Sequence, residues 1–488
     1  MLISKAIARY SGIVVVISSA AVLILLRLQL PTKFLALAIL AAVFPAVLLL
    51  VKDARRFLLA AACFSIPLHL DVNFIHLFEH QAGASTLGIS LTDILVVLLL
   101  FQLLIRNAAA KQPTAVFFPK IGLPLILYLE AAALSMLWAP RLDLAVMEVV
   151  RMAKFTLMFF VLLNHLREEQ DVRLVAWSLL AAVALQSFLA TAQMVRGGVL
   201  GLDFLGEAPP DADDETSIWR AMGTLGHPNK LATFLEVLLL LPLAAYLFEK
   251  KKPLRLIALL IFFLGVPAMM MTGSRGAWIS FAAAMAFFGL FLLTSRHVRP
   301  TTIIKLAMAG VFILTLIAGT MSEMLYQRLF GPDYGSAAGR IPMFKIALNI
   351  ISAHPAGGVG INNYQVNMRN YNDAVESLRY VAITRPVHNM YLLVAGETGV
   401  IGLAAMLSVL LGLFSTLRRA RTSQAPMISL TAAALYGGMI AFCVHGLVDK
   451  HPPGGSAIFY VVAALAAGLV VIDRKRVETV RPAEALYV

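Results

Sequence analysis

The chain has 488 residues, of which 60% are hydrophobic and 14% are charged, and its mean hydropathy is +0.83. This composition excludes a soluble globular fold, because runs of about 20 apolar residues, the length that crosses a bilayer as a helix, recur from end to end. The formal net charge of +13 indicates basic cytoplasmic loops rather than a nucleic-acid partner. Cys63 and Cys443 lie inside apolar runs, so neither a disulfide framework nor a cysteine-ligated metal site is expected.

We predict an all-α polytopic membrane protein in which residues 1–488 form a single transmembrane domain. The expected count is 14 helices, or 12 if the short segment at 57–70 and the proline-broken early segments do not all cross. The first apolar run is followed by Arg27 and not by a small-residue cleavage site, which indicates a retained span rather than a signal peptide. The predicted spans are 11–28, 34–51, 57–70, 89–105, 121–138, 150–165, 174–195, 230–248, 254–272, 276–294, 303–320, 389–416, 427–448 and 455–472.

Basic residues recur in every second loop of this scheme. The positive-inside rule therefore predicts that these loops and both termini face the cytoplasm of a bacterial inner membrane. On the opposite, periplasmic side two loops are long, 196–228 and 321–388, and the second has an excess of Lys and Arg that topology does not require. The basic loops are 52–56, 106–120, 167–173, 250–255, 296–305, 418–421 and 473–476.

The periplasmic loop at 321–388 is predicted to be folded and to form a lid over the active site. Helical periodicity predicts one helix from Arg340 to Ile351, ended by His354-Pro355, and a second at 363–377. The glycines at 357–360 are expected to make a flexible joint between the two helices. The apolar face expected to be buried consists of Ile341, Phe344, Leu348 and Ile351.

The polar break Thr272-Gly-Ser-Arg-Gly276 lies between two apolar runs. An arginine at membrane depth costs roughly 2.5–3.5 kcal/mol on insertion scales, which an anionic ligand would offset. Gly273, Ser274 and Gly276 favour close approach of a ligand, and a guanidinium binds phosphate bidentately. The alternative is that Arg275 is an interfacial arginine that extends to the lipid headgroups.

His388-Asn389 opens a later span at the end of the long loop. An imidazole is the neutral side chain able to take a proton from a hydroxyl near pH 7, although a capping or interfacial role is the alternative. His445 and Asp449 are spaced i,i+4 and share one helical face. They lack a third metal ligand at a plausible spacing, so a metal site is not expected.

Charged residues elsewhere have simpler explanations. Glu148, Arg151 and Lys154 form a charged face for which a structural ion pair is as good an explanation as a substrate site. Arg340 can equally be a solvated surface residue, and His227-Pro228-Asn229 is expected to be a turn before a helix.

These motifs together resemble the bacterial O-antigen ligase family, within the group of O-antigen ligases, O-antigen polymerases and O-oligosaccharyltransferases. The resemblance covers about 270–402 and is carried by three segments in order. The most specific is His388-Asn389, nine residues, then Gly399-Val-Ile-Gly402. The others are Thr272 to Trp278, and Gly339-Arg340 through His354-Pro355 to Asn363.

The resemblance implies a C-type glycosyltransferase-like fold and an O-antigen ligase active at the periplasmic face. It would move a preassembled polysaccharide from undecaprenyl diphosphate to the lipid A-core oligosaccharide of lipopolysaccharide, with inversion and without metal, nucleotide or other cofactor. His388 would be the general base, Arg275 and Arg340 would hold the diphosphate, and Asp449 falls where the family often carries a further functional acid. Candidate substrate contacts are Asn389, Ser274, Gly276, Arg385 and Arg220. The apolar groove for the prenyl tail is expected between the spans near 254–294.

Three alternatives stay open. A polymerase of the same group would extend the lipid-linked chain, and nothing in the motifs excludes it. A protein O-oligosaccharyltransferase is less favoured, because many of those carry a C-terminal extension and this chain ends soon after Arg476. A polysaccharide or lipid transporter would also have many spans and buried charges, but it predicts inverted repeats with matching broken helices, which the sequence does not display.

Overall fold

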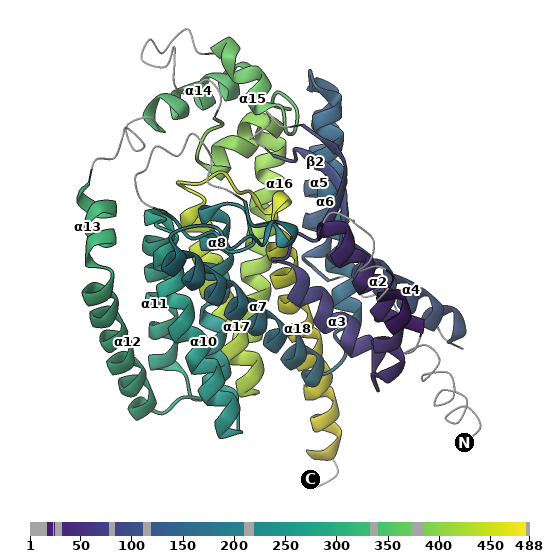
Figure 1. Cartoon of the computed structure of the whole chain (residues 1–488), viewed down its shortest axis with the longest axis vertical. Helices are drawn as coiled ribbons and strands as arrows, with labels where there is room; N and C mark the ends of the chain where they lie inside the picture. The colour runs from purple at the N-terminus through teal and green to yellow at the C-terminus, as the bar shows by residue number, and fades with distance from the viewer. Residues whose placement is uncertain are drawn as a thin grey trace.

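The computed structural model describes residues 17–22, 24, 32–77, 83–110, 119–208, 219–331, 340–371 and 385–484. Over these residues the chain is a bundle of long helices, with the short helices α14 (Arg340–Ala353) and α15 (Tyr364–Asn367) at one end of it (Figure 1). We call this end the α14 end. The class predicted from hydropathy, a mostly helical multi-pass membrane protein, is confirmed.

The first half of the described chain holds ten elements and includes a departure from an all-helical fold. Strands β1 and β2 form an antiparallel ribbon in which Asp71 pairs with Ser90 and His76 with Thr86. The elements are α2 (Thr32–Leu50), α3 (Ala54–Ser65), β1 (Asp71–His76), β2 (Thr86–Ser90), α4 (Leu91–Ala109), α5 (Gly122–Ser135), η1 (Met136–Trp138), α6 (Leu142–His165), α7 (Glu169–Arg196) and η2 (Asp203–Leu205).

The second half supplies the bundle centre. Helix α17 packs against α8, α9, α11 and α16, and most of its side chains are buried. The elements are α8 (Pro228–Leu238), α9 (Leu240–Phe248), α10 (Lys252–Met271), α11 (Arg275–Thr294), α12 (Pro300–Thr320), α13 (Ser322–Phe330), α14, α15, η3 (Met368–Tyr371), α16 (Met390–Arg421), α17 (Pro426–His445), η5 (Pro453–Gly455) and α18 (Ala457–Glu484).

Local sequence signals account for where several of these helices begin and end. Ser90 and Asp93 form a capping box at the start of α4. His227 caps α8 through Nδ1, which accepts the N–H of Asn229 at 3.1 Å, and Pro228 occupies the first turn. Helix α7 ends at Gly197, whose φ is 68°. The turn predicted at His227-Pro228-Asn229 is therefore confirmed.

Nine helices among the described residues are long and apolar enough to cross a membrane. They are α4, α7, α8 with α9, α10, α11, α12, α16, α17 and α18. Every predicted span from 34–51 onward overlaps a helix, although α3 ends at Ser65 within the predicted span 57–70, and 11–28 lies largely outside the described residues. Helix α3 has 12 residues and is about 18 Å long, too short to cross a hydrocarbon core of about 30 Å alone. The total of 14, or 12, stays a prediction.

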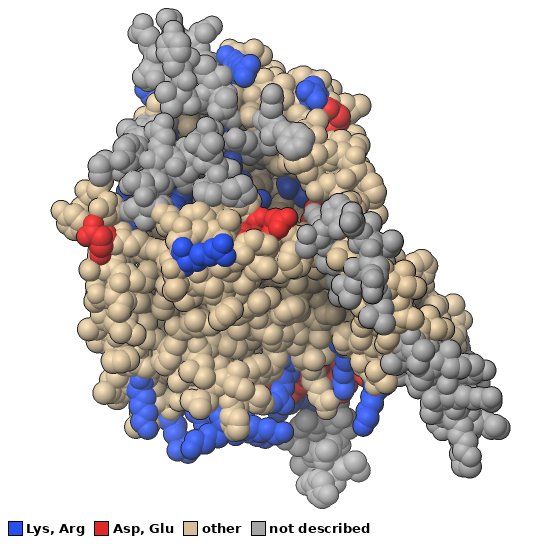
Figure 2. Space-filling view, in the orientation of Figure 1, with Lys and Arg blue, Asp and Glu red and all other residues tan. Residues whose placement is uncertain are grey.

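Charge divides the bundle into levels. Lys and Arg gather along the edge opposite the α14 end, and above them lies a broad band almost without charge (Figure 2). Basic residues fill the turns α9–α10, α11–α12 and α16–α17, which lie at that edge in Figure 1. This distribution is typical of a membrane-spanning bundle with one strongly basic face.

Helix α14 forms as predicted, but it buries a different face. Ile346, Ala347 and Ile350 are fully buried against Val387 and Leu393, whereas Ile341 and Leu348 are exposed at 62% and 53%. The predicted buried face is therefore wrong by a rotation about the helix axis. The buried face is the one that meets α16, and periodicity alone does not specify which apolar stripe docks. In the described part of the second predicted helix, 363–377, the chain forms α15 and η3, where Tyr364 and Met368 are buried and Tyr371 packs beside them.

The glycine turn at 357–360 is fixed to α16, so the predicted flexible joint is wrong. Val359 and Gly360 donate backbone N–H groups to the carbonyls of Gly396 and Glu397 at 3.0 and 2.9 Å. Helix α16 is broken there at Gly399, whose φ is 65°, and a Cβ at Gly399 would lie 2.0 Å from the carbonyl oxygen of Ala356. The glycine is required because the turn approaches the helix backbone directly. The segment 372–384 of the predicted lid lies outside the described residues.

Candidate active site

Two arginines from elsewhere in the chain hold the turn between α10 and α11. Arg220 donates from Nε to the carbonyl of Thr272 at 2.9 Å, and Arg328 of α13 donates from Nε and Nη2 to the carbonyl of Gly273 at 3.0 and 2.7 Å. Gly273 has a φ of 61°, a conformation that favours glycine. Arg275 is the first residue of α11, where backbone N–H groups have no carbonyl one turn earlier to bond. The guanidinium groups of Arg220 and Arg328 therefore lie beside the helix start that carries Arg275, an arrangement that suits an anionic ligand.

Gly276 has a different use from the predicted close approach of a ligand. A Cβ on this residue would lie 2.8 Å from His445 Cδ2 and 2.8 Å from Val448 Cγ2. The space over the glycine is therefore filled by the end of α17, and we correct the prediction that Gly276 leaves room for substrate there. Ser274 is also buried, with its Oγ 3.4 Å from His445 Nε2.

Asp449 lies at the centre of the site, in the loop after α17, and is 2% exposed. Its Oδ2 is 3.0 Å from His451 Nδ1 and 3.6 Å from His445 Nε2, and its Oδ1 is 3.9 Å from His388 Nδ1. Burial opposes the charged carboxylate, but the nearby imidazole of His451, together with those of His445 and His388, holds the pKa of Asp449 well below its ordinary value. Asp449 is therefore an anion near neutral pH.

His388 lies just before α16 with part of its side chain exposed. Burial lowers the pKa of His388 to about 4; Asp449 raises it, and the charges of Lys450, Arg340 and His451 lower it further. The imidazole is therefore neutral at pH 7 and can accept a proton. The charge of Arg340 acts on the same imidazole, so the structure brings together Arg340, His388 and Asp449, which are far apart in the sequence.

Asn389 caps α16 and ties it to the loop that carries Asp449. Its Oδ1 accepts the N–H groups of Tyr391 and Leu392 at 3.0 Å, and its Nδ2 donates to the carbonyl of Leu447 at 3.0 Å. The side chain thereby fixes the position of the neighbouring His388. Arg385 lies three residues before His388 on the same short loop.

The charged face on α6 is a structural one. Glu148 accepts the backbone N–H of Ala84 at 2.8 Å and pairs with Arg151, and Lys154 donates to the carbonyl of Gly88 at 3.0 Å and pairs with Asp93. These contacts tie α6 to the β-ribbon and to α4, which agrees with the structural alternative in the sequence.

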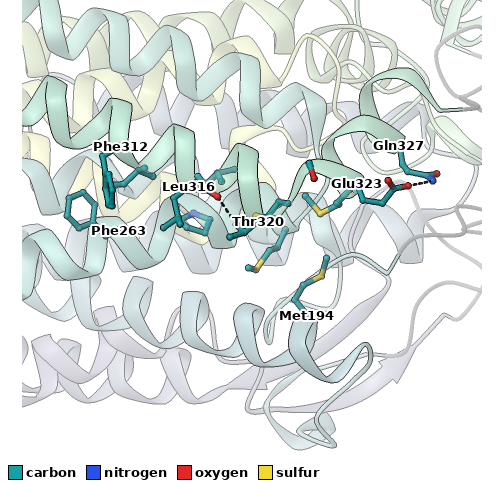
Figure 3. A pocket seen from close by; sticks show the side chains of 14 residues that line it. Met194, Phe263, Phe312, Leu316, Thr320, Glu323 and Gln327 are labelled. Carbon is teal, nitrogen blue, oxygen red and sulfur yellow. Dashed lines mark hydrogen bonds between the residues drawn. The ribbon is translucent and has the colours of Figure 1, made fainter.

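An apolar cavity of about 770 Å³ lies beside the turn that Arg220 and Arg328 hold, between α10, α12, α13 and the end of α7. Phe263 and Phe312 lie at one end of the cavity and Glu323 and Gln327 at the other (Figure 3). The lining residue Met271 directly precedes Thr272, and Gln327 precedes Arg328. The apolar groove for the prenyl tail was expected between the spans near 254–294, the range of α10 and α11. The cavity shares α10 with that range, and the position of the groove stays a prediction.

Four residues around this site were given no role from the sequence: Arg328, His445, His451 and Glu236, whose Oε1 lies 2.9 Å from His445 Nδ1. Glu236 had a signal, because it is an acid inside an apolar span. His445 was paired with Asp449 by spacing but was not given a role. Arg328 and His451 had no distinguishing pattern, and their positions depend on how α13 and the loop after α17 fold. Among the residues that the structure describes, no group of three or more His, Cys, Asp or Glu side chains is arranged to hold a metal ion.

Comparison with known proteins adds an independent finding. Residues 237–407 match a protein family model whose description is O-antigen ligase. The matched region contains the turn before Arg275, α13, α14, the glycine turn and the first half of α16. No curated protein matches the chain.

Proposed function

We propose that the chain, whose residues 237–407 match the O-antigen ligase family model, transfers a preassembled polysaccharide from undecaprenyl diphosphate to lipid A-core oligosaccharide. The reaction takes place at the α14 end, which faces the periplasm in our proposal. The opposite end carries the basic turns expected in the cytoplasm. The observation that carries the proposal is that a neutral, partly exposed His388 lies 3.9 Å from Asp449, and that the turn before Arg275 is connected to the same carboxylate through His445.

In this mechanism His388 is the general base. The acceptor hydroxyl oxygen attacks the anomeric carbon of the donor, and His388 takes the hydroxyl proton as that bond forms. The bond from the anomeric carbon to the diphosphate oxygen breaks, and its electron pair leaves with the diphosphate. A single displacement of this kind inverts the anomeric centre. Asp449 supports the imidazolium that results, because an opposite charge stabilises the protonated base.

Arg275 and Arg340 bind the departing diphosphate, whose negative charge grows as the bond breaks. Arg220 and Arg328 hold the turn so that the first amides of α11 also face the diphosphate. Arg385, Ser274 and Asn389 remain proposed substrate contacts. The Ser274 hydroxyl and the Asn389 amide are engaged within the protein, so we expect both to act mainly by holding their neighbours in place.

The cavity between α10 and α12 is the proposed site for the start of the prenyl tail. It is lined mostly by apolar side chains and ends beside the turn that Arg328 holds. A lipid whose tail entered this cavity would have its diphosphate next to the same turn. The outward surface of α12 is apolar, with Met308, Val311 and Phe312 more than 60% exposed, so the cavity borders the lipid phase.

The test is transfer by the purified protein in proteoliposomes containing undecaprenyl-diphosphate-linked O-antigen and lipid A-core acceptor. Polysaccharide on the lipid A-core band supports a ligase. Longer lipid-linked chains with unchanged lipid A-core would instead establish the polymerase alternative. Movement of the lipid-linked donor across the bilayer without either product would establish the transporter alternative.

A further inference from the structure

A buried chain of polar side chains connects Ser274, in the turn before Arg275, to the base His388. The middle member of this chain is His445. Glu236 Oε1 is 2.9 Å from His445 Nδ1, and Glu236 Oε2 accepts the Ser280 hydroxyl at 2.6 Å. The other imidazole nitrogen, Nε2, lies 3.4 Å from Ser274 Oγ and 3.6 Å from Asp449 Oδ2. Glu236 and His445 are 0% and 4% exposed at their side chains, so neither is a surface residue.

We propose that Glu236 and His445 are positioning residues for the transfer reaction. They fix the position of the turn before Arg275 relative to the His388–Asp449 pair. The proposal rests on the proposed function. Neither residue touches substrate in it; both act through Ser274 and Asp449.

Burial makes the Glu236 contact specific. An imidazole between two acceptors needs its ring fixed, and a buried acceptor on Nδ1 fixes both the ring orientation and the tautomer. Glu236 supplies that acceptor from α8. Ser280 of α11 and the N–H of Nδ1 each use one carboxylate oxygen, so both oxygens of the buried acid have partners.

Steric contact makes His445 a spacer as well as a hydrogen-bonding group. The ring occupies the volume that a Cβ on Gly276 would fill, with Nε2 3.1 Å and Cδ2 2.8 Å from that position. The first turn of α11 therefore rests on the imidazole. Since Arg275 is the residue before Gly276, we expect a shift of the ring to move the start of α11, which carries Arg275, relative to His388.

Matched variants separate this role from simple folding. Glu236→Gln keeps an oxygen for Nδ1 and an amide for the Ser280 hydroxyl, whereas Glu236→Leu keeps neither. His445→Asn keeps a donor near Nδ1 but no longer reaches Ser274 or Asp449. Gly276→Ala removes no polar group and displaces the ring. Controls are Thr431→Val, a buried position elsewhere on α17, and Gly289→Ala on α11, where a Cβ meets nothing within 4 Å.

The measurement is kcat and KM for the lipid-linked donor in proteoliposomes with protein matched by amount. Misplacement of reacting groups by about 1 Å can cost about 100-fold, so we expect kcat to fall by about 10- to 100-fold in Glu236→Leu, His445→Asn and Gly276→Ala. KM should change less than threefold. Glu236→Gln should recover most of kcat, and the Gly276→Ala, His445→Asn double variant should be no worse than the poorer single variant.

Three results would overturn the inference: a kcat within threefold of the parent in all three variants, equal loss in Glu236→Gln and Glu236→Leu, or additive loss in the double variant. If Glu236→Leu does not fold, Gly276→Ala and Glu236→Gln still decide the question. Failure of the parent protein itself to ligate would refute the proposed function instead, so the two failures are distinguishable.

Discussion

His388 Nδ1 and Asp449 Oδ1 lie 3.9 Å apart, across the loop that precedes α16 and the loop that follows α17. The separation is longer than a hydrogen bond, so the contact is electrostatic in this state. Asp449 is held from the other side by His451 and faces His445. The carboxylate can therefore stabilise an imidazolium at His388 without taking its proton.

Replacing His388 by alanine should reduce transfer by at least about 10²–10⁴-fold, the typical contribution of a positioned proton acceptor. The protein should still insert and bind donor, because Asn389 continues to cap α16. The assay is initial rate in proteoliposomes, with His297→Ala as control; His297 bonds the carbonyl of Ser423 at the opposite end of the bundle. Wild-type rates in well-expressed His388→Ala protein would remove this residue from the mechanism.

The pH dependence of transfer should report on the same imidazole. Since the base must be deprotonated and the pKa of His388 is lowered to about 4, kcat/KM should be flat from about pH 6 to 8 and fall only as the pH approaches 4. In the donor complex a bound diphosphate favours the imidazolium and raises the pKa of His388. The acidic limb of kcat should therefore lie at higher pH than that of kcat/KM. Coincident limbs would mean that the diphosphate does not bind near His388.

The parts of the site that the sequence predicts are those that hydropathy makes conspicuous. Arg275 and His388 were found because they are polar residues at the edges of apolar runs. A charge or an imidazole there costs free energy unless a partner or ligand offsets it. The boundaries of the spans were found for the same reason. Hydropathy indicates that a helix is apolar, but it does not indicate which neighbouring helix it packs against. Tertiary packing sets the face by which α14 docks and the partners of Asp449, and the sequence alone does not specify that packing.

Gly399 and Gly402 are a second case in which tertiary packing could not be predicted from the sequence. Gly399 and Gly402 were noticed as a signature, but the sequence did not explain them. The structure explains the first by the backbone of the 355–360 turn, which approaches α16 at Gly399. The β-ribbon was missed because its strands are short and lie between predicted spans, where weak alternation is easily taken for a loop.

Arg275 should fail as lysine as well as alanine. Loss of one preorganised donor to a developing oxyanion costs about 10²–10³ in kcat, which we expect for Arg275→Ala. Arg275→Lys keeps the charge but loses the bidentate geometry, so a loss of at least about tenfold is expected. Arg255→Lys at the far end of α10 is the control, because Arg255 bonds the carbonyl of Tyr246 there. Near-normal activity of Arg275→Lys would reduce the residue to a source of charge or an anchor.

Transfer should not depend on a divalent metal or an added nucleotide. The driving force is already stored in the bond from the sugar to the diphosphate, and the arginines supply the positive charge that a metal ion would otherwise contribute. The measurement is the rate of purified protein before and after dialysis against EDTA, with re-addition of Mg²⁺, Mn²⁺ or Zn²⁺. Activity lost with the chelator and restored by one of these ions would contradict the prediction.

The cavity should be required for long-tailed donors in particular. Thr320 and Thr315 lie on α12 and each bonds the carbonyl four residues earlier, at 2.8 and 3.0 Å, but Thr320 lines the cavity and Thr315 does not. Thr320→Trp places a large ring in the space proposed for the prenyl tail, and Thr315→Trp is its matched control. A tail excluded from the cavity buries less apolar area, and each Å² of that area contributes about 25 cal/mol of binding free energy. We therefore expect at least a tenfold higher KM for undecaprenyl-linked donor in Thr320→Trp. A donor with a short, water-soluble prenyl chain should be used equally well by both variants. Equal KM values of the two variants for the long-tailed donor would show that the tail binds elsewhere.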